Sequence, residues 1–257
     1  MSLCKLKNIL DDLIQNYNAI ALRADLASGT VALEELEELS SLAKENNISL
    51  TVKIGGCDAT NDIFQLKNIC ANSIIIPMVE TPYALKKFIT NCKKIYSEDE
   101  IMSLNLYPNI ETITAYNNFD EIFAVDEAKY IKGIVLGRDD MAGSMGLTRE
   151  DINSDRILEI AKNLQNKIYA LGKEFILGGE IRPKAISFIN KLDCPLSRCE
   201  TRMIVFSGEN FIDNALEDKI LKALEFEILW LENKKNKTQY DISRIEKLKS
   251  NLPNRIY

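Results

Sequence analysis

Histidine is absent from this 257-residue sequence, and its absence removes several classes of chemistry. Without imidazole there is no Ser-His or Cys-His nucleophile pair, no histidine general base and no zinc site that uses histidine ligands. Long apolar runs are also missing, since no stretch reaches the 18 consecutive apolar residues that predict a membrane-spanning helix. Any acid/base chemistry in this protein therefore falls to other side chains, and no membrane partner is expected.

The sequence has no excess of positive charge. Its 32 Lys and Arg residues stand against 38 Asp and Glu residues, which gives a net charge of -6. An acidic surface repels phosphate backbones, so a nucleic-acid partner is not expected. The six cysteines are dispersed, and acidic residues interrupt the apolar pattern near the first methionine, unlike a signal peptide. These features favour free thiols over a disulfide framework and predict a cytoplasmic location.

Short aliphatic runs alternate with longer amphipathic segments along the chain, which is typical of repeated βα units around a parallel sheet. This pattern predicts an α/β fold with a single (β/α)8 TIM-type barrel domain over residues 1–257. The expected strands cover 18–25, 48–54, 72–77, 101–111, 131–137, 173–178 and 201–206, with an eighth strand placed within 192–200. The expected helices cover 3–16, 31–46, 60–70, 82–95, 113–125, 154–171 and 183–191.

Residues 211–257 form a C-terminal helical extension in this interpretation, and helical spacing of apolar residues continues to about 250. The extension is too long to be a simple barrel helix. Two alternatives are open: a long amphipathic helix that packs on its own barrel, or an arm that reaches a neighbouring subunit of a homo-oligomer.

Two acidic motifs follow neighbouring strands. Residues 107–112 (YPNIET) place Asn109 and Glu111 on the same side of a strand, because strand side chains alternate. The next strand runs into residues 137–146 (GRDDMAGSMG), a glycine-rich loop that carries Asp140. Catalytic residues of such barrels come from these strand ends. Two carboxylates from adjacent strands, completed by water and substrate oxygens, predict a site for Mg²⁺ or Mn²⁺.

The sequence around these motifs resembles HpcH/HpaI aldolases and the beta subunits of citrate lyases. The resemblance covers roughly residues 18 to 206 and is strongest from Glu111 to Asp140. It includes Asn118 with 119–122 (FDEI) and 133–137 (GIVLG). Upstream, 76–81 (IPMVET) is similar to a Pro-Met-Val strand of the family, and 52–56 (VKIGG) lies where the family usually has a substrate-binding arginine.

The resemblance implies roles for individual residues. Glu111 and Asp140 correspond to the family's metal ligands, and the bound cation would chelate a small 2-oxo acid or related carboxylate. Backbone amides of Gly137, Arg138 and Asp139 would meet the substrate carboxylate, as the family implies. Asn109 is expected beside the same substrate.

The main departures from the family are Lys53 in place of arginine and the missing histidine base. Lys53 would hold the keto oxygen, but without the bidentate geometry of a guanidinium. Asp25, Glu80 and Glu180 are candidates for proton transfer, with Asp25 or Glu80 preferred.

Further local features carry open alternatives. Residues 178–182 (GGEIR) are either a phosphate or carboxylate seat or a tight turn. Arg23 and Asp25 share one side of a strand and form either a buried ion pair or part of the substrate site. Arg202 meets either a substrate anion or an acidic neighbour.

Three functional hypotheses follow. The first is a metal-dependent carbon-carbon lyase or aldolase that acts on a pyruvate-like 2-oxo acid through an enolate. The second is a citrate lyase-like or malyl-CoA lyase-like enzyme that acts on CoA thioesters. The third is a barrel without catalytic activity that serves as a binding subunit, motivated by the absent histidine and by Lys53.

Overall fold

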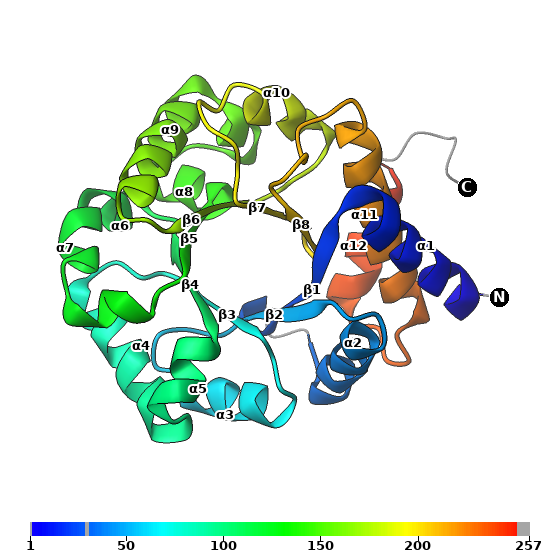
Figure 1. Cartoon of the computed structure of the whole chain (residues 1–257). Helices are drawn as coiled ribbons and strands as arrows, with labels where there is room; N and C mark the ends of the chain where they lie inside the picture. Colours follow the sequence, from blue (N-terminus) through cyan, green and yellow to red (C-terminus); the bar gives the residue numbers. More distant parts are fainter. Residues whose placement is uncertain (1, 29–30, 251–257) are drawn as a thin grey trace.

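The computed structural model describes residues 2–28 and 31–250, and within them eight strands close into a barrel (Figure 1). The barrel predicted from the sequence is therefore confirmed, including the eighth strand expected within 192–200. The strands are β1 (Ala19–Asp25), β2 (Ser49–Lys53), β3 (Ser73–Ile76), β4 (Asn105–Ile110), β5 (Gly133–Gly137), β6 (Glu174–Gly178), β7 (Arg198–Glu200) and β8 (Ile204–Ser207).

Helices form the outer layer around this barrel (Figure 1). They are α1 (Ser2–Tyr17), α2 (Leu33–Glu45), α3 (Thr60–Asn68), α4 (Pro82–Ile95), α5 (Glu98–Ser103), α6 (Ile113–Asn117), α7 (Phe119–Phe123), α8 (Arg138–Ser144), α9 (Asp155–Ala170), α10 (Ile186–Ile189), α11 (Leu216–Asn233) and α12 (Gln239–Lys249).

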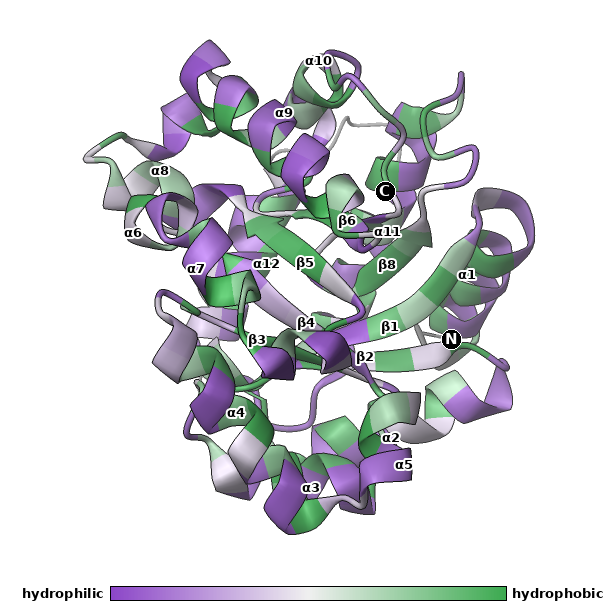
Figure 2. Cartoon of the chain, turned by 60° about the vertical axis from the view of Figure 1, so that its left-hand side comes forward, coloured by the Kyte–Doolittle hydropathy of each residue, from purple (hydrophilic) through white to green (hydrophobic). Residues whose placement is uncertain are grey.

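Alternation of side chains along the strands divides the apolar residues into two sets. The main core lies between strands and helices, and it includes Ile74 and Ile76. The residue between them, Ile75, packs instead with Tyr107, Val135 and Ile176 in a separate buried cluster. Because alternate strand residues point to opposite faces, this second cluster fills the barrel interior. Hydrophobic residues are accordingly concentrated on the strands, and hydrophilic residues are spread over the outer helices (Figure 2).

The last strand departs from the parallel arrangement expected from the sequence. Strands β1 to β7 pair in parallel in chain order, whereas β8 pairs antiparallel with both β7 and β1. Only residues 201–203 connect β7 to β8. A parallel pair needs a crossover of a dozen or more residues, so this short turn permits only an antiparallel hairpin.

The predicted strand 101–111 is corrected at its start, because residues 98–103 form α5 and the strand begins at Asn105. The helix is started by a capping box, in which the Ser97 side chain accepts from the Glu100 amide and the Glu100 carboxylate accepts from the Ser97 amide. The expected helix 113–125 is also divided, since α6 ends before Asn118 and α7 begins after it.

The C-terminal extension consists of two helices rather than one. A capping box between Thr238 and Asp241 starts α12 after the break that follows α11. Ile220, Leu224 and Ile228 of α11 are buried within their own chain, so the helix packs on its own barrel as one alternative predicted. Residues 251–257 of the predicted extension lie outside the described residues.

All six cysteines fall within the described residues and are free thiols, as the sequence predicted.

Candidate active site

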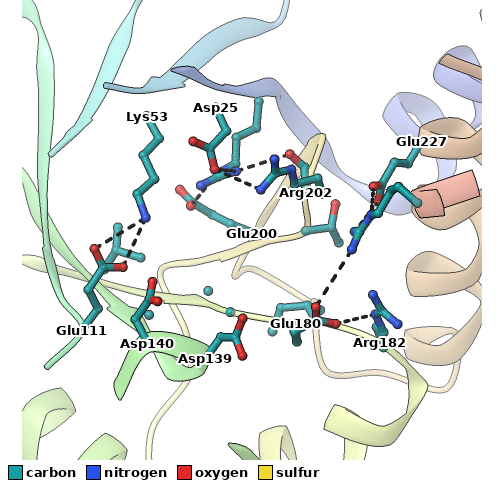
Figure 3. Close-up of a pocket in the computed structure, with 18 of the residues that line it drawn as sticks. Asp25, Lys53, Glu111, Asp139, Asp140, Glu180, Arg182, Glu200, Arg202 and Glu227 are labelled. Carbon is teal, nitrogen blue, oxygen red and sulfur yellow. Dashed lines mark hydrogen bonds and ion pairs between the residues drawn. The ribbon is translucent and has the colours of Figure 1, made fainter. Parts of the chain in front are cut away.

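A cavity of about 320 Å³ lies at the carboxyl ends of the strands (Figure 3). Strand ends supply one wall, and α11 and α12 supply the opposite wall. The charged residues that line it are Arg23, Asp25, Lys53, Glu111, Asp139, Asp140, Arg149, Glu180, Arg182, Glu200, Arg202, Glu227, Arg244 and Lys247.

The carboxylate of Glu111 is the most firmly held group in this cavity. Its side chain is 1 % exposed and follows directly after β4. Oε1 accepts a hydrogen bond from the Met78 amide at 3.0 Å, and Oε2 accepts one from Asn109 Nδ2 at 2.7 Å. Lys53 Nζ lies 3.3 Å from Oε2. These donors hold the buried carboxylate in one orientation.

Asp140 meets Glu111 from the adjacent strand end, and the two carboxylates lie within hydrogen-bonding reach of each other (Figure 3). Loss of hydration is the largest cause that raises the pKa of Asp140, and the negative charge of Glu111 raises it further. Among the described residues no cation forms an ion pair with Asp140, whereas Glu111 has Lys53. The predicted convergence of these two side chains is present.

The donor set fits a hard divalent cation. Glu111 and Asp140 offer carboxylate oxygens, and Asn109 Oδ1 is buried with no hydrogen-bond partner among the described residues. No group of three or more His, Cys, Asp or Glu side chains within residues 2–28 and 31–250 is arranged to hold a metal. Mg²⁺ is commonly bound through only one or two carboxylates together with substrate and water oxygens, so two carboxylates suffice.

Gly179 leaves two backbone amides at the start of α8 accessible. Gly179 has a φ of +77°, and a Cβ there would lie 2.5 Å from the Arg138 amide nitrogen and 2.8 Å from that of Asp139. These are two of the amides that the sequence assigned to a substrate carboxylate. A larger residue at 179 would cover them, so glycine leaves the position accessible.

The Arg138 side chain has a structural role, distinct from the substrate contact predicted for its backbone amide. It is fully buried, its Nε donates to the Gly178 carbonyl at 3.2 Å, and its guanidinium stacks over the Phe188 ring at 4.8 Å. Burial lowers the pKa of Arg138 to about 10. The side chain therefore fixes the loop after β6 and does not line the cavity.

Asp25 and Arg23 belong to an ion network in the middle of the cavity. Asp25 Oδ2 lies 3.1 Å from Arg202 NH1 and 3.9 Å from Arg23 NH1, so the predicted ion pair of Arg23 and Asp25 is present. Arg23 Nε also donates to Glu200 Oε2 at 3.2 Å. Glu200 is buried, and its desolvation raises its pKa against the lowering effect of Arg23. The sequence had not singled out Glu200.

Glu80 is not among the residues that line this cavity, and its role in proton transfer stays a prediction. Its Oε1 accepts a hydrogen bond from Thr112 Oγ1 at 2.6 Å, and that hydroxyl in turn accepts from the Ala115 amide to cap α6. Asp139 does line the cavity, where Arg149 NH2 lies 3.1 Å from its Oδ2.

The end of the cavity lined by Glu180, Arg182, Glu227 and Arg244 is called the far end. The sequence predicted only part of it. Residues 178–182 were predicted as a turn or an anion seat, and Glu180 with a φ of +48° forms the turn. Arg182 Nε lies 2.6 Å from Glu180 Oε2. Arg244 of α12 pairs with Glu227 of α11 through two N–H groups, at 2.7 and 3.2 Å. No sequence signal placed α12 over the barrel, because that contact depends on how α11 packs.

A family model described as HpcH/HpaI aldolase/citrate lyase matches residues 19–175. The chain belongs to the HpcH/HpaI aldolase/citrate lyase family. Proteins of this family are lyases and aldolases that act on small carboxylates and generally depend on divalent metals, which supports a lyase-type function for this chain. Comparison with curated proteins gives no match.

Two solved structures share the fold. An HpcH/HpaI aldolase from Desulfitobacterium hafniense DCB-2 has 14% sequence identity and a TM-score of 0.58, over 71% of this chain and 76% of that one. A variant of the citrate synthase SbnG has 16% identity and a TM-score of 0.51, over 70% of this chain and 84% of that one.

The segment that matches the HpcH/HpaI family includes Lys53, Asn109, Glu111 and Asp140, but it ends before Arg182. The end of the cavity around Glu111 and Asp140, called the near end, therefore lies within the segment that matches the family model. The far end is formed by residues beyond that segment. Among the residues that the structure describes, no helix is long and apolar enough to cross a bilayer.

Proposed function

We propose that this chain is a metal-dependent carbon-carbon lyase that acts on a pyruvate-like 2-oxo acid. The observation that carries the proposal is the convergence of the Glu111 and Asp140 carboxylates at the cavity wall. The two residues come from adjacent strand ends, and the family model covers both.

Glu111, Asp140 and Asn109 Oδ1 would hold Mg²⁺ or Mn²⁺. When bound there, the cation acts as a Lewis acid toward the enolate that forms when the carbon-carbon bond breaks. Asn109 and the Met78 amide hold Glu111 in place, so the carboxylate keeps one position through the reaction.

Lys53 supplies a positive charge next to the predicted cation position, where it would bind a substrate oxygen. Its ammonium lies 3.3 Å from Glu111, and the side chain is 13 % exposed. A single ammonium donates as a point charge and lacks the two parallel N–H groups of an arginine. We therefore expect Lys53 to stabilise the developing negative charge and to fix substrate orientation less strictly than arginine.

Asp25 is the preferred group for proton transfer, because it lines the same cavity and Glu80 does not. Arg202 and Arg23 form ion pairs with its carboxylate and hold it in the cavity. In cleavage of a 4-hydroxy-2-oxo acid, Asp25 would take the hydroxyl proton as the carbon-carbon bond breaks to an aldehyde and an enolate, and would return that proton to the enolate carbon. With pyruvate alone, the same carboxylate would remove and return a methyl proton.

The experiment follows exchange of pyruvate methyl protons with deuterated solvent by NMR, with Mn²⁺ or Mg²⁺ present. We expect EDTA to abolish the exchange, added metal to restore it, and Glu111→Gln to slow it at least about 100-fold, in the range for losing an essential charged group. Glu159→Gln, a change of an exposed helical glutamate, is the control and should exchange like the parent.

Exchange that survives both EDTA and Glu111→Gln would reject the proposal. No exchange at all, together with no Mn²⁺ binding by electron paramagnetic resonance, would favour the barrel that serves as a binding subunit.

The alternative with a CoA thioester stays a prediction, and saturation-transfer NMR with acetyl-CoA tests it. The cavity of about 320 Å³ lies at the small end of ligand pockets, which favours a small acid.

A further inference from the structure

The ion network in the middle of the cavity joins two carboxylates through one guanidinium. Arg23 of β1 pairs with Asp25, two residues along the same strand, and with Glu200 at the end of β7. Figure 3 shows Asp25, Glu200 and Arg202 together in the cavity. The proposed reaction uses Asp25 and leaves Glu200 without a function.

Glu200 is the carboxylate that holds Arg23 most closely. Arg23 Nε donates to Glu200 Oε2 at 3.2 Å, and Arg23 NH1 donates to the Arg202 carbonyl at 3.3 Å. The side chains of Arg23 and Glu200 are 11 % and 3 % exposed, so water has little access to either group. A buried donor that loses its acceptor is left without compensation for its lost hydration. Glu200 therefore fixes the direction in which Arg23 Nε points.

Asp25 receives only a longer contact from the same guanidinium. Its Oδ2 accepts from Arg202 NH1 at 3.1 Å, whereas Arg23 NH1 lies 3.9 Å away, beyond hydrogen-bonding distance. Its Oδ1 accepts from the Ser28 amide at 3.2 Å. Arg202 and Ser28 thus fix the carboxylate. A carboxylate oxygen has more than one lone pair, so Oδ2 keeps a position for a further proton donor such as a substrate hydroxyl.

We propose that Glu200 is a positioning residue for proton transfer: it binds Arg23 and thereby keeps this guanidinium from closing on Asp25, whose carboxylate stays open to the substrate. Without Glu200, Asp25 is the carboxylate that remains for Arg23, and a guanidinium favours two parallel hydrogen bonds to a carboxylate. Arg23 would then occupy the oxygen that accepts the substrate proton. The inference rests on the proposed function, because Glu200 acts only through the proton transfer assigned to Asp25.

The test measures exchange of pyruvate methyl protons with deuterated solvent over a range of pyruvate concentrations, with Mn²⁺ present. Glu200→Met removes the acceptor and keeps the length of the side chain. We expect kcat for exchange to fall about 10- to 100-fold, the range for a catalytic group that is displaced. The KM for pyruvate and the affinity for Mn²⁺ should stay within about twofold, because pyruvate and the cation bind at the near end.

Further variants show whether Glu200 acts through Arg23. Glu200→Gln keeps an acceptor for Arg23 Nε, so it should exchange at least about threefold faster than Glu200→Met. The double change Arg23→Met with Glu200→Met removes the guanidinium together with its acceptor, and proteins tolerate apolar replacement of a buried ion pair. Exchange should recover about tenfold relative to Glu200→Met alone, within the range for coupled neighbours.

Glu200→Asp guards against a folding defect in Glu200→Met. It keeps the charge and draws the carboxylate back from Arg23, so kcat should fall selectively here too. Urea unfolding establishes that each variant is folded.

Glu174 of β6 provides the matched control. Its Oε2 accepts from Arg198 Nε at 2.9 Å, which is the same kind of pair in the same barrel. Glu174 is not among the residues that line the cavity. Glu174→Met should lower stability and leave kcat for exchange unchanged, whereas a purely structural role of Glu200 would make the two variants behave alike.

An unchanged kcat in Glu200→Met would overturn the inference, and so would an equal loss of kcat in folded Glu174→Met. A loss that removal of Arg23 does not recover would also overturn it, since Glu200 would then act on the substrate directly. Absence of exchange in the parent rejects the proposed function itself. Metal-dependent exchange in the parent, with unchanged kcat in Glu200→Met, rejects the positioning role alone.

Discussion

Gly137 has no side chain, and the Glu111 carboxylate occupies the space that a Cβ at position 137 would fill. A Cβ at position 137 would lie 2.6 Å from Glu111 Oε2 and 2.8 Å from Glu111 Cβ, closer than real Cβ atoms approach. Glu111 cannot move aside freely, because Met78 and Asn109 hold both of its oxygens. The glycine that ends β5 is thus a steric requirement of the proposed cation site, in addition to its predicted amide contact.

Gly137→Ala should therefore displace Glu111 and weaken Mn²⁺ binding about 10- to 100-fold, since a misplaced ligand loses most of its contribution. Overpacking should also lower the free energy of unfolding by about 1 to 3 kcal/mol. Titration of Mn²⁺ by electron paramagnetic resonance measures the first effect. The matched change Gly143→Ala, where no atom of the described part of the chain lies within 4 Å of the new Cβ, should leave Mn²⁺ affinity intact. Unchanged affinity in Gly137→Ala would contradict the proposed position of the cation.

Arg138→Gln should act on stability, because the parent side chain is fully buried and bonded to backbone carbonyls. Loss of charge-assisted hydrogen bonds and of the stack on Phe188 should reduce the free energy of unfolding by about 3 kcal/mol. Urea denaturation measures this, with exposed Arg156→Gln as the control. A stable variant that had lost only substrate affinity would show that the side chain contacts the substrate instead.

Glu200 should make stability depend on pH. Burial raises its folded-state pKa above the ordinary value of 4.5, so the folded protein holds this proton more tightly than the unfolded chain. The stabilisation is complete below 4.5 and is lost as the pH rises through the raised pKa. Parent and Glu200→Gln are compared by urea unfolding from pH 4 to 8, and subtraction cancels the other acidic groups. The parent should gain stability relative to the variant toward acid pH, and a flat or opposite difference would contradict the shift.

Lys234 connects the turn after α11 to two other helices. Its Nζ lies 3.0 Å from Glu35 Oε1 of α2 and 3.0 Å from Asp241 Oδ1 of α12, and its side chain is 5 % exposed. Lys234→Ala should cost about 3 kcal/mol of unfolding free energy, because it leaves the buried Asp241 carboxylate and the partly buried Glu35 carboxylate without this cation. Hydrogen exchange should become faster in α12.

The control for this helix is Lys235→Ala, which removes the exposed neighbouring charge. It should change neither stability nor exchange in α12. If Lys234→Ala behaved in the same way, the ion pairs would not hold α12 over the cavity, and the far end of the cavity would need another support.

Local sequence patterns were sufficient to predict most strands of the barrel. Aliphatic runs predicted β2, β3, β5 and β6 to within a few residues, because strands buried on both faces require continuous apolar side chains. The error at 101–104 came from the same rule, since aliphatic residues also occur in α5. The capping box from Ser97 to Glu100 was the local signal that would have separated the two.

The sequence by itself determined the closed βα barrel, the family and the pair Glu111 and Asp140, because these depend on strand periodicity and on motifs at neighbouring strand ends. Only the tertiary structure decided that Glu80 accepts a hydrogen bond from the Thr112 hydroxyl that caps α6, that Glu200 joins the ion network and that α12 covers the cavity. Each of these depends on contacts between residues that are distant in the chain, and local secondary-structure propensity does not encode such contacts.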